Sequence, residues 1–176
     1  MSKVYLAMYK AEGNWVDKII RLFTGKPYSH CEIFVEGGMF DTVFDENWER
    51  IRVWRPCYKA YSSSPRDDGV RMKEISKPSR IRCNEYNGKF KPENWDLIHL
   101  PYINGQQIED FYQKTKGKKY DFFGAVACVL PLPERTSRYF CSEWCYEAIL
   151  GIQPRKTVSP NQLAKMIKEE ITLHKV

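Results

Sequence analysis

The chain lacks an apolar run long enough to cross a membrane. Its longest such stretch, residues 122–132, has eleven residues, whereas a helix that spans a bilayer needs about 20. The first ten residues also lack the apolar core and the small-residue cleavage site of a secretory signal. We therefore expect no transmembrane segment and a cytoplasmic location, in which the cysteines stay reduced.

Histidine is scarce, and the motifs of zinc-binding and nucleic-acid-binding proteins are missing. Of the 3 histidines, His99 and His174 stand isolated in the sequence. Cys141 and Cys145 are spaced like half of a zinc site, but no second matched pair accompanies them. No recognition helix, zinc finger or RNA-binding motif accompanies the basic residues. We expect no metal, no other cofactor and no nucleic-acid partner.

The composition is that of an ordinary globular protein. The 176 residues include 28 Lys and Arg against 22 Asp and Glu, and 43% are hydrophobic. This balance excludes a disordered or fibrous chain and fits one domain, residues 1–176. Basic residues outnumber acidic ones in the stretch 55–96, and we expect a basic insertion at about 56–94. It is either a solvated surface or a contact for an anionic substrate or partner surface.

Local patterns predict an α+β domain that contains an antiparallel meander. Alternating apolar residues predict strands at 4–9, 29–35, 39–44, 51–54 and 95–100. Two glycines predict a turn at 36–38, and the 56–94 stretch is expected to add one or two short strands. Helical spacing, capping residues and glycine stops predict helices at 15–23, 105–116, 141–150 and 160–170.

His30 and Glu32 form the first candidate pair for chemistry. Side chains two positions apart on a strand share a face, so these two project to one side and Cys31 projects to the other. A carboxylate beside a histidine can orient the imidazole as a general base. Alternatively, His30 lies on an edge strand, and Glu32 faces solvent or substrate or pairs with a basic residue of the insertion.

Cys141 is the candidate nucleophile because it stands at the predicted start of a helix. A helix N-terminus and a nearby imidazolium both stabilise a thiolate. The alternative is that Cys141 is a small buried apolar residue, as free cysteines often are. Cys145, one helical turn further on, is expected to lie in the core.

Four short segments, taken in order, resemble the circularly permuted NlpC-type papain-like cysteine hydrolases. In this branch the histidine segment precedes the cysteine segment, as it does here. The segments are FTGKPYSHCEI at 23–33, GKKYD at 117–121, FCSE at 140–143 and VSPNQL at 158–163. The resemblance covers residues 1–55 and about 95–165 but not the insertion. It implies a papain-like fold, with a central antiparallel sheet or small barrel packed against helices.

The resemblance also implies a role for each matched residue. Cys141 would be the nucleophile, His30 the general base and Glu32 the residue that orients the imidazole. Tyr120 would lie near the nucleophile and support the oxyanion, or it would serve only in packing. Glu143 would be structural.

The implied activity is that of a cysteine peptidase or amidase, a thiol hydrolase that cleaves peptide or peptidoglycan-type amide bonds. The missing export signal fits an intracellular protein better than a wall enzyme, including a phage-encoded protein that acts in its host cell. One rival is a lipid-directed acyltransferase or thioesterase of the same fold, with an acyl substrate. The other is a non-enzymatic module that binds a partner protein through the basic insertion.

Overall fold

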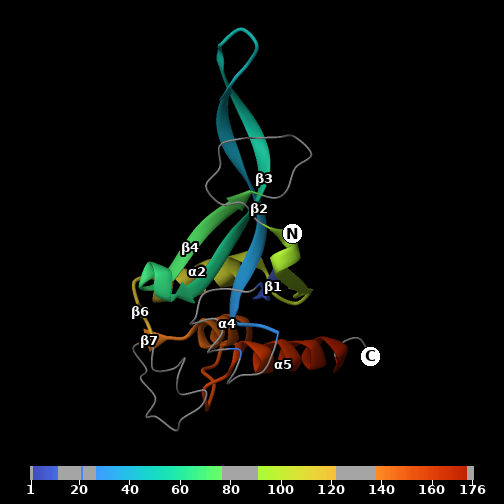
Figure 1. Ribbon diagram of the computed structural model, residues 1–176, viewed down its shortest axis with the longest axis vertical. Helices are drawn as coiled ribbons and strands as arrows, with labels where there is room; N and C mark the ends of the chain where they lie inside the picture. The colour runs from blue at the N-terminus through green and yellow to red at the C-terminus, as the bar shows by residue number, and fades with distance from the viewer. Residues whose placement is uncertain (1, 12–20, 22–26, 77–90, 122–137, 174–176) are drawn as a thin grey trace.

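The chain forms an antiparallel sheet that carries helices on one face, as seen in a computed structural model that describes residues 2–11, 21, 27–76, 91–121 and 138–173 (Figure 1). Its five strands are antiparallel and follow the order β4-β3-β2-β1-β5. They are β1 Val4–Tyr9, β2 His30–Phe44, β3 Arg50–Ser64, β4 Gly69–Ser76 and β5 Trp95–His99. The predicted α+β class with a central antiparallel sheet is thereby confirmed.

Three helices and two short strands complete the described part of the chain. The helices are α2 Gly105–Thr115, α4 Cys141–Leu150 and α5 Pro160–Leu173, and the 3-10 turns are η1 Pro65–Asp67 and η2 Pro92–Asn94. Strands β6 Lys119–Tyr120 and β7 Arg138–Tyr139 pair in parallel next to the start of α4. None of the described helices is long and apolar enough to span a membrane.

Several predicted elements occur at the predicted positions. Strand β1 and helix α4 have the predicted bounds, and α2 and β5 each end one residue earlier than predicted. Helix α5 begins after the predicted cap, Ser159, whose Oγ accepts a hydrogen bond from the Gln162 N–H while Gln162 Oε1 accepts one from the Ser159 N–H. This reciprocal pair is a capping box. Apart from Arg21, which is helical, the helix predicted at 15–23, with its cap Asn14, lies outside the described residues.

The turn predicted at 36–38 is absent, because β2 continues through both glycines. Gly37 and Gly38 pair with Cys57 and Pro56 of β3, and neither has a positive φ angle. A Cβ atom on Gly38 would lie 2.1 Å from the indole of Trp54. The sequence suggested a turn, but at Gly38 the missing side chain instead gives room to a ring from the neighbouring strand.

Part of the stretch assigned to an insertion belongs to the sheet. Residues 57–64 of β3 pair with 69–76 of β4, so both segments extend the same antiparallel ladder. These residues carry many serines and charged side chains, which hid the strand pattern. Residues 77–90 lie outside the described part.

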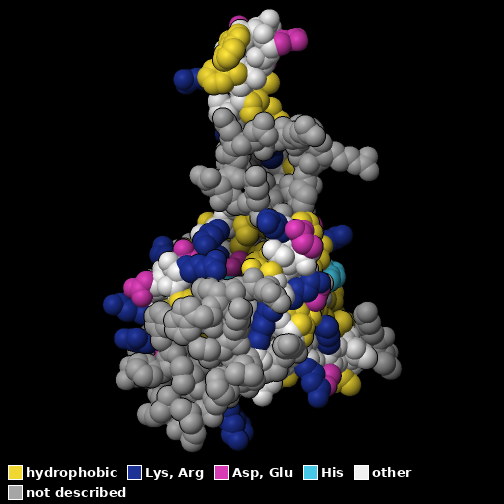
Figure 2. Space-filling model, in the orientation of Figure 1, with side chains coloured by type: hydrophobic (Ala, Val, Ile, Leu, Met, Phe, Trp, Pro, Cys, Tyr) yellow, Lys and Arg dark blue, Asp and Glu magenta, His cyan; other side chains and the backbone are white. Residues whose placement is uncertain are grey.

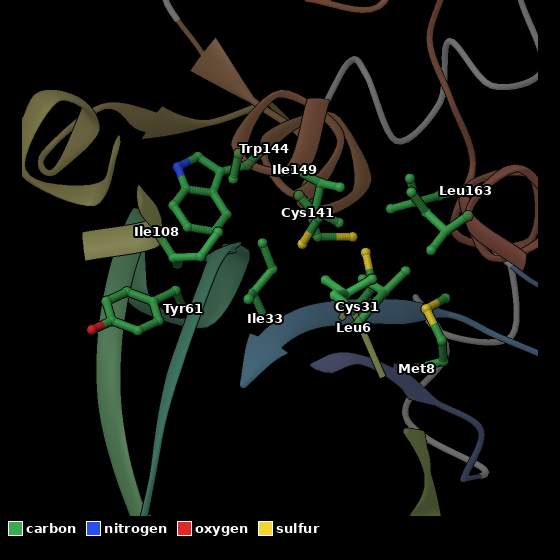
Figure 3. Close-up of a cluster of buried hydrophobic side chains, with 14 of the residues drawn as sticks. Leu6, Met8, Cys31, Ile33, Tyr61, Ile108, Cys141, Trp144, Ile149 and Leu163 are labelled. Carbon is green, nitrogen blue, oxygen red and sulfur yellow. The ribbon is translucent and has the colours of Figure 1, made fainter. Parts of the chain in front are cut away.

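The main core fills the space between the sheet and the helices (Figure 3). It receives alternate side chains of β1 and β2, and from the helices Ile108, Trp144 and Leu163. The indole Nε1 of Trp144 donates a buried hydrogen bond of 2.9 Å to Thr115 Oγ1, which ties α4 to α2. A smaller cluster on the other face consists of Ala7, Phe34, Tyr58 and Ala60. This packing holds helix α4, with Cys141 at its start, against the inner face of β2.

Candidate active site

Helix α4 begins at Cys141 because a nearby side chain caps its N-terminus. The carboxylate of Glu143 accepts a hydrogen bond of 3.1 Å from the Phe140 N–H, which would otherwise lack an intrahelical partner. The helix ends at Gly151, whose φ of 71° is the left-handed conformation that glycine adopts readily. Glu143 thus has the structural role that the resemblance implies, and Cys141 occupies the first helical position.

His30 and Glu32 lie on the same side of β2, as strand geometry predicts. Nε2 of His30 is 3.1 Å from Oε1 of Glu32. The Glu32 side chain is only 5% exposed, so the alternative of a solvent-facing carboxylate is wrong. The carboxylate can therefore orient the imidazole ring.

Cys141 contacts two consecutive residues of β2, although these point to opposite faces of the strand. Its thiol interacts with the His30 imidazole and with the thiol and backbone of Cys31, and these interactions shift its pKa. Cys31 extends from β2 toward α4 in Figure 3. Cys141 reaches both because it lies beside the first residues of β2. The structure thus brings together the predicted histidine and cysteine, which are far apart in the sequence.

The charges of this cluster favour a thiolate beside an imidazolium. Burial alone would raise the pKa of the Cys141 thiol, but the Cys31 hydrogen bond and the charge and hydrogen bond of His30 outweigh it and hold the pKa well below its usual value. Burial alone would lower the pKa of His30, but Cys141 and Glu32 raise it to about 10. Both shifts favour the charged forms of the two residues.

Cys31 remains a neutral thiol in this cluster. Burial, followed by its contacts with Cys141 and Cys145, raises the pKa of Cys31 well above its usual value. Its S–H group is therefore available to donate a hydrogen bond to the Cys141 thiolate. Cys145 is fully buried in the core, as the sequence predicts.

Arg71 is the second partner of Glu32. Its Nη2 lies 2.6 Å from Oε1 of Glu32, the same oxygen that contacts His30. Burial opposes ionisation of Glu32, but His30 and Arg71 together lower its pKa to about 2. Oε2 of Glu32 is buried and has no hydrogen-bond partner among the described residues. Sequence reasoning left open that a basic residue of the 56–94 stretch pairs with Glu32, and Arg71 is that residue.

Arg71 is itself held in place by two further groups. Its Nε is 2.9 Å from Oδ2 of Asp67, and its Nη1 is 3.3 Å from the Ala60 carbonyl oxygen. Lys73 lies 3.0 Å from the same carboxylate oxygen of Asp67. Because several contacts fix the guanidinium group, the position of Glu32 is fixed as well.

The VSPNQL segment positions the chain next to His30. The Asn161 side chain accepts a hydrogen bond of 3.1 Å from the Tyr28 N–H and donates one of 2.9 Å to the Tyr28 carbonyl oxygen. The Ser142 hydroxyl donates to the Val158 carbonyl oxygen. Helix α5 and the residues before it therefore connect the histidine segment to the cysteine segment. Sequence reasoning noted the motif but did not assign this function to it.

Tyr120 is buried beside the residue that precedes Cys141. Its ring lies edge-on to Phe140, with centroids 6.1 Å apart, and it pairs with Tyr139 across the β6–β7 ladder. The structure thus places Tyr120 in the packing around the start of α4, where Cys141 lies.

The Cys141 side chain is almost completely covered, with 1% exposure, whereas the His30 side chain is 19% exposed. A cavity of about 460 Å³ lies elsewhere, between α2 and the C-terminal half of α4. Its lining includes Gln107, Phe111 and Ala148 but not Cys141.

No group of described residues has the three His, Cys, Asp or Glu side chains that a metal site needs. None of the four cysteines of the described part, Cys31, Cys57, Cys141 and Cys145, forms a disulfide. No family model, curated protein or solved structure matches this chain.

Proposed function

We propose that the protein is a cysteine hydrolase that cleaves an amide bond through a thioester on Cys141. One observation carries the proposal: Cys141 and His30 lie close enough to shift each other's pKa strongly, and Nε2 of His30 is 3.1 Å from a buried carboxylate oxygen of Glu32. A nucleophile, a base and a group that orients the base define a catalytic triad by their geometry. The order of these residues in the chain supports the finer assignment to the circularly permuted NlpC-type papain-like fold.

In the acylation step, the Cys141 thiolate attacks the carbonyl carbon and a C–S bond forms. The backbone N–H of Cys141, at the start of α4, stabilises the oxyanion; losing one such donor typically costs about 100-fold to 1000-fold in rate. His30 then transfers its proton to the leaving nitrogen as the C–N bond breaks. Because Nε2 faces Glu32, Nδ1 is the nitrogen that serves the sulfur and the leaving group.

In the deacylation step, His30 takes a proton from water while the water oxygen attacks the thioester. The C–S bond breaks, the carboxylic acid leaves and the Cys141 thiolate returns. Glu32 keeps the imidazole in one tautomer and stabilises its protonated form. Arg71 acts through Glu32 and is a positioning residue.

Alkylation by iodoacetamide, followed across pH, tests access to Cys141 and its ionisation together. An unperturbed thiol, with a pKa of about 8.5, reacts slowly at neutral pH, whereas Cys141 is expected to have reached its plateau rate there. Peptide mass spectrometry separates its label from that on Cys145, the matched buried control one turn along α4. The His30→Ala variant should shift the Cys141 profile to higher pH. If Cys141 does not react in the folded protein, the proposed enzymatic function is wrong. The alternative of a non-enzymatic binding module would then remain.

A substrate panel then identifies the bond that is cleaved. We expect turnover of peptide amides or peptidoglycan stem peptides, with acyl esters and isopeptide conjugates as comparisons. Turnover of acyl esters alone would retain the thioester chemistry but replace the amidase with a lipid-directed thioesterase or acyltransferase. Turnover must disappear in Cys141→Ala, because a contaminating hydrolase would remain active.

A further inference from the structure

The strands β2 and β3 extend far beyond the rest of the sheet as a two-stranded ribbon (Figure 1). We call residues 37–56 the hairpin arm. The β1–β2 ladder ends at Val35, and the β3–β4 ladder begins at Cys57. Within the described residues, the two strands of the arm therefore pair only with each other, and both edges of the ribbon are open. An isolated two-stranded hairpin is at best marginally stable in water.

The arm exposes large apolar side chains in a group. Figure 2 shows hydrophobic side chains gathered at its far end. Trp48 is 82% exposed and Phe40 is 61% exposed, and three more large apolar side chains of the arm are exposed: Phe44, Ile51 and Trp54. Single exposed apolar residues are normal, but contiguous groups mark interaction sites.

Most of these side chains lie on one face of the ribbon, together with two arginines. Phe40 is paired with Trp54 and Phe44 with Arg50, and paired residues share a face. Arg52 lies on the same face between them, with its guanidinium 5.0 Å from the Phe40 ring centre. The Arg50 guanidinium lies 5.9 Å from the Phe44 ring centre. The face is therefore an aromatic surface with two cations stacked on it.

The turn at the end of the arm holds Trp48 in an unusual conformation. Its φ is 60°, a region that bulky residues rarely adopt. The Asp45 carboxylate accepts hydrogen bonds of 2.9 Å from the N–H groups of Asn47 and Glu49, which fixes the turn. The Trp48 ring lies 6.1 Å from the Phe44 ring. The turn thus presents an aromatic ring to the outside at a cost in backbone strain.

Acidic and basic side chains occupy adjacent parts of the arm, an arrangement that makes it complementary to itself. The turn carries the exposed acidic residues Glu46 and Glu49, and the shaft carries the exposed Arg50 and Arg52. Two arms laid antiparallel place the acidic turn of each beside the arginine shaft of the other, whereas parallel arms place like charges together. A bilayer would meet the acidic turn first, and burying such charges is costly.

We infer that the hairpin arm is a dimerisation surface and that its partner is the arm of a second copy of this chain. A twofold axis relates the two arms, because a self-complementary patch forms an isologous interface. The aromatic faces of the two arms bury each other. This inference is independent of the proposed hydrolase activity.

Sedimentation velocity or light scattering of the whole protein measures its oligomeric state. At about 50 µM we expect a dimer that dissociates on dilution. Trp48→Ala and Phe40→Ala should each weaken dimerisation at least tenfold, which is about 1.4 kcal/mol. The control, Ile152→Ala, removes an exposed apolar side chain outside the arm and should leave the dimer unchanged. Circular dichroism and Cys141 labelling show that each variant is folded.

A charge exchange separates a second copy from other partners. One variant carries Glu46→Lys and Glu49→Lys, and the other carries Arg50→Glu and Arg52→Glu. Each variant alone should be mostly monomeric, because its turn and its shaft then carry charges of the same sign. A mixture of the two variants should form a heterodimer. A monomeric parent protein at about 50 µM, or a mixture that stays monomeric, would overturn the inference. So would a monomer that binds vesicles of phosphatidylcholine and phosphatidylglycerol through the arm.

Discussion

Arg71 reaches Glu32 across the intervening strand β3, and their closest atoms are 2.6 Å apart. The residue between them is Ser62, which pairs directly with Arg71 and is fully buried. Its short side chain leaves room for the guanidinium to pass over β3. A carboxylate two strands away from a cation can thus be neutralised without either charge reaching bulk solvent.

Arg71→Ala is expected to lower the free energy of unfolding by about 3 kcal/mol, because it leaves the buried Glu32 charge without one of its two partners. The rate of Cys141 alkylation at neutral pH should fall as well, because the Glu32–His30 geometry loosens. Lys73→Ala is the control from the same strand. Lys73 is 47% exposed and pairs only with Asp67 among the described ion pairs, so the loss should stay below about 1 kcal/mol. Equal losses in the two variants would contradict the positioning role.

Glu32→Gln should change the pH dependence of stability. The folded pKa of Glu32 is lowered to about 2, below the unfolded value of about 4.3. The carboxylate therefore contributes stability that is full above pH 4.3 and is lost as the pH falls toward 2. Denaturant titrations should show a difference on the order of 3 kcal/mol between parent and variant at pH 6 that shrinks toward pH 2. A difference that is independent of pH would show that the carboxylate charge is not involved.

Cys31→Ala should raise the pKa of Cys141, because it removes the thiol that donates to the thiolate. The alkylation profile of Cys141 would move to higher pH while its plateau rate is retained. Cys57→Ala is the matched control, since Cys57 is a buried cysteine of the same sheet that pairs with Ser76 at the end of β4. A profile that moves equally in both variants would point to general loosening of the core.

Asn161→Ala removes two hydrogen bonds to the Tyr28 backbone. We expect a loss of about 2 kcal/mol in stability and slower alkylation of Cys141, because Tyr28 lies two residues before His30. Lys165→Ala, a 79% exposed position on the same helix, should change neither quantity. Unchanged reactivity in folded Asn161→Ala would remove the link between α5 and the histidine segment.

Cys141→Ala is expected to abolish turnover and to lower the melting temperature by a few degrees. The side chain is part of the core, so removing its sulfur leaves a small cavity and costs on the order of 1 kcal/mol. Cys145→Ala, from the same core, should cost a similar amount of stability but retain turnover. Full activity in Cys141→Ala would exclude a thioester intermediate.

Periodicity in the sequence predicted the parts of the fold that repeat locally. Helix α4, strand β1 and the shared face of His30 and Glu32 follow from residues within a few positions of one another. The pairing of Glu32 with Arg71 does not, because it depends on the order of β2, β3 and β4 in the sheet. The contact of Cys141 with Cys31 also lay beyond local rules, since it requires α4 to begin beside the start of β2.

The two glycines of β2 show why a local signal can mislead. Gly37 and Gly38 are typical of a turn, but the cross-strand pairing of the whole hairpin keeps them extended. The indole of Trp54, which comes from the other strand, occupies the space above Gly38. Only the three-dimensional pairing reveals that the missing side chain serves the packing of a distant ring.

The clamp of Asn161 on Tyr28 has a consequence for folding kinetics. The two residues are 133 positions apart, and Cys141 joins the same region, so the thiolate environment exists only after nearly the whole chain has closed on itself. Closing so long a loop carries a large entropic cost and is slow relative to local helix formation. The low-pKa thiol should therefore emerge with the last refolding phase. Pulsed alkylation of Cys141 during refolding would therefore report when the native topology is complete.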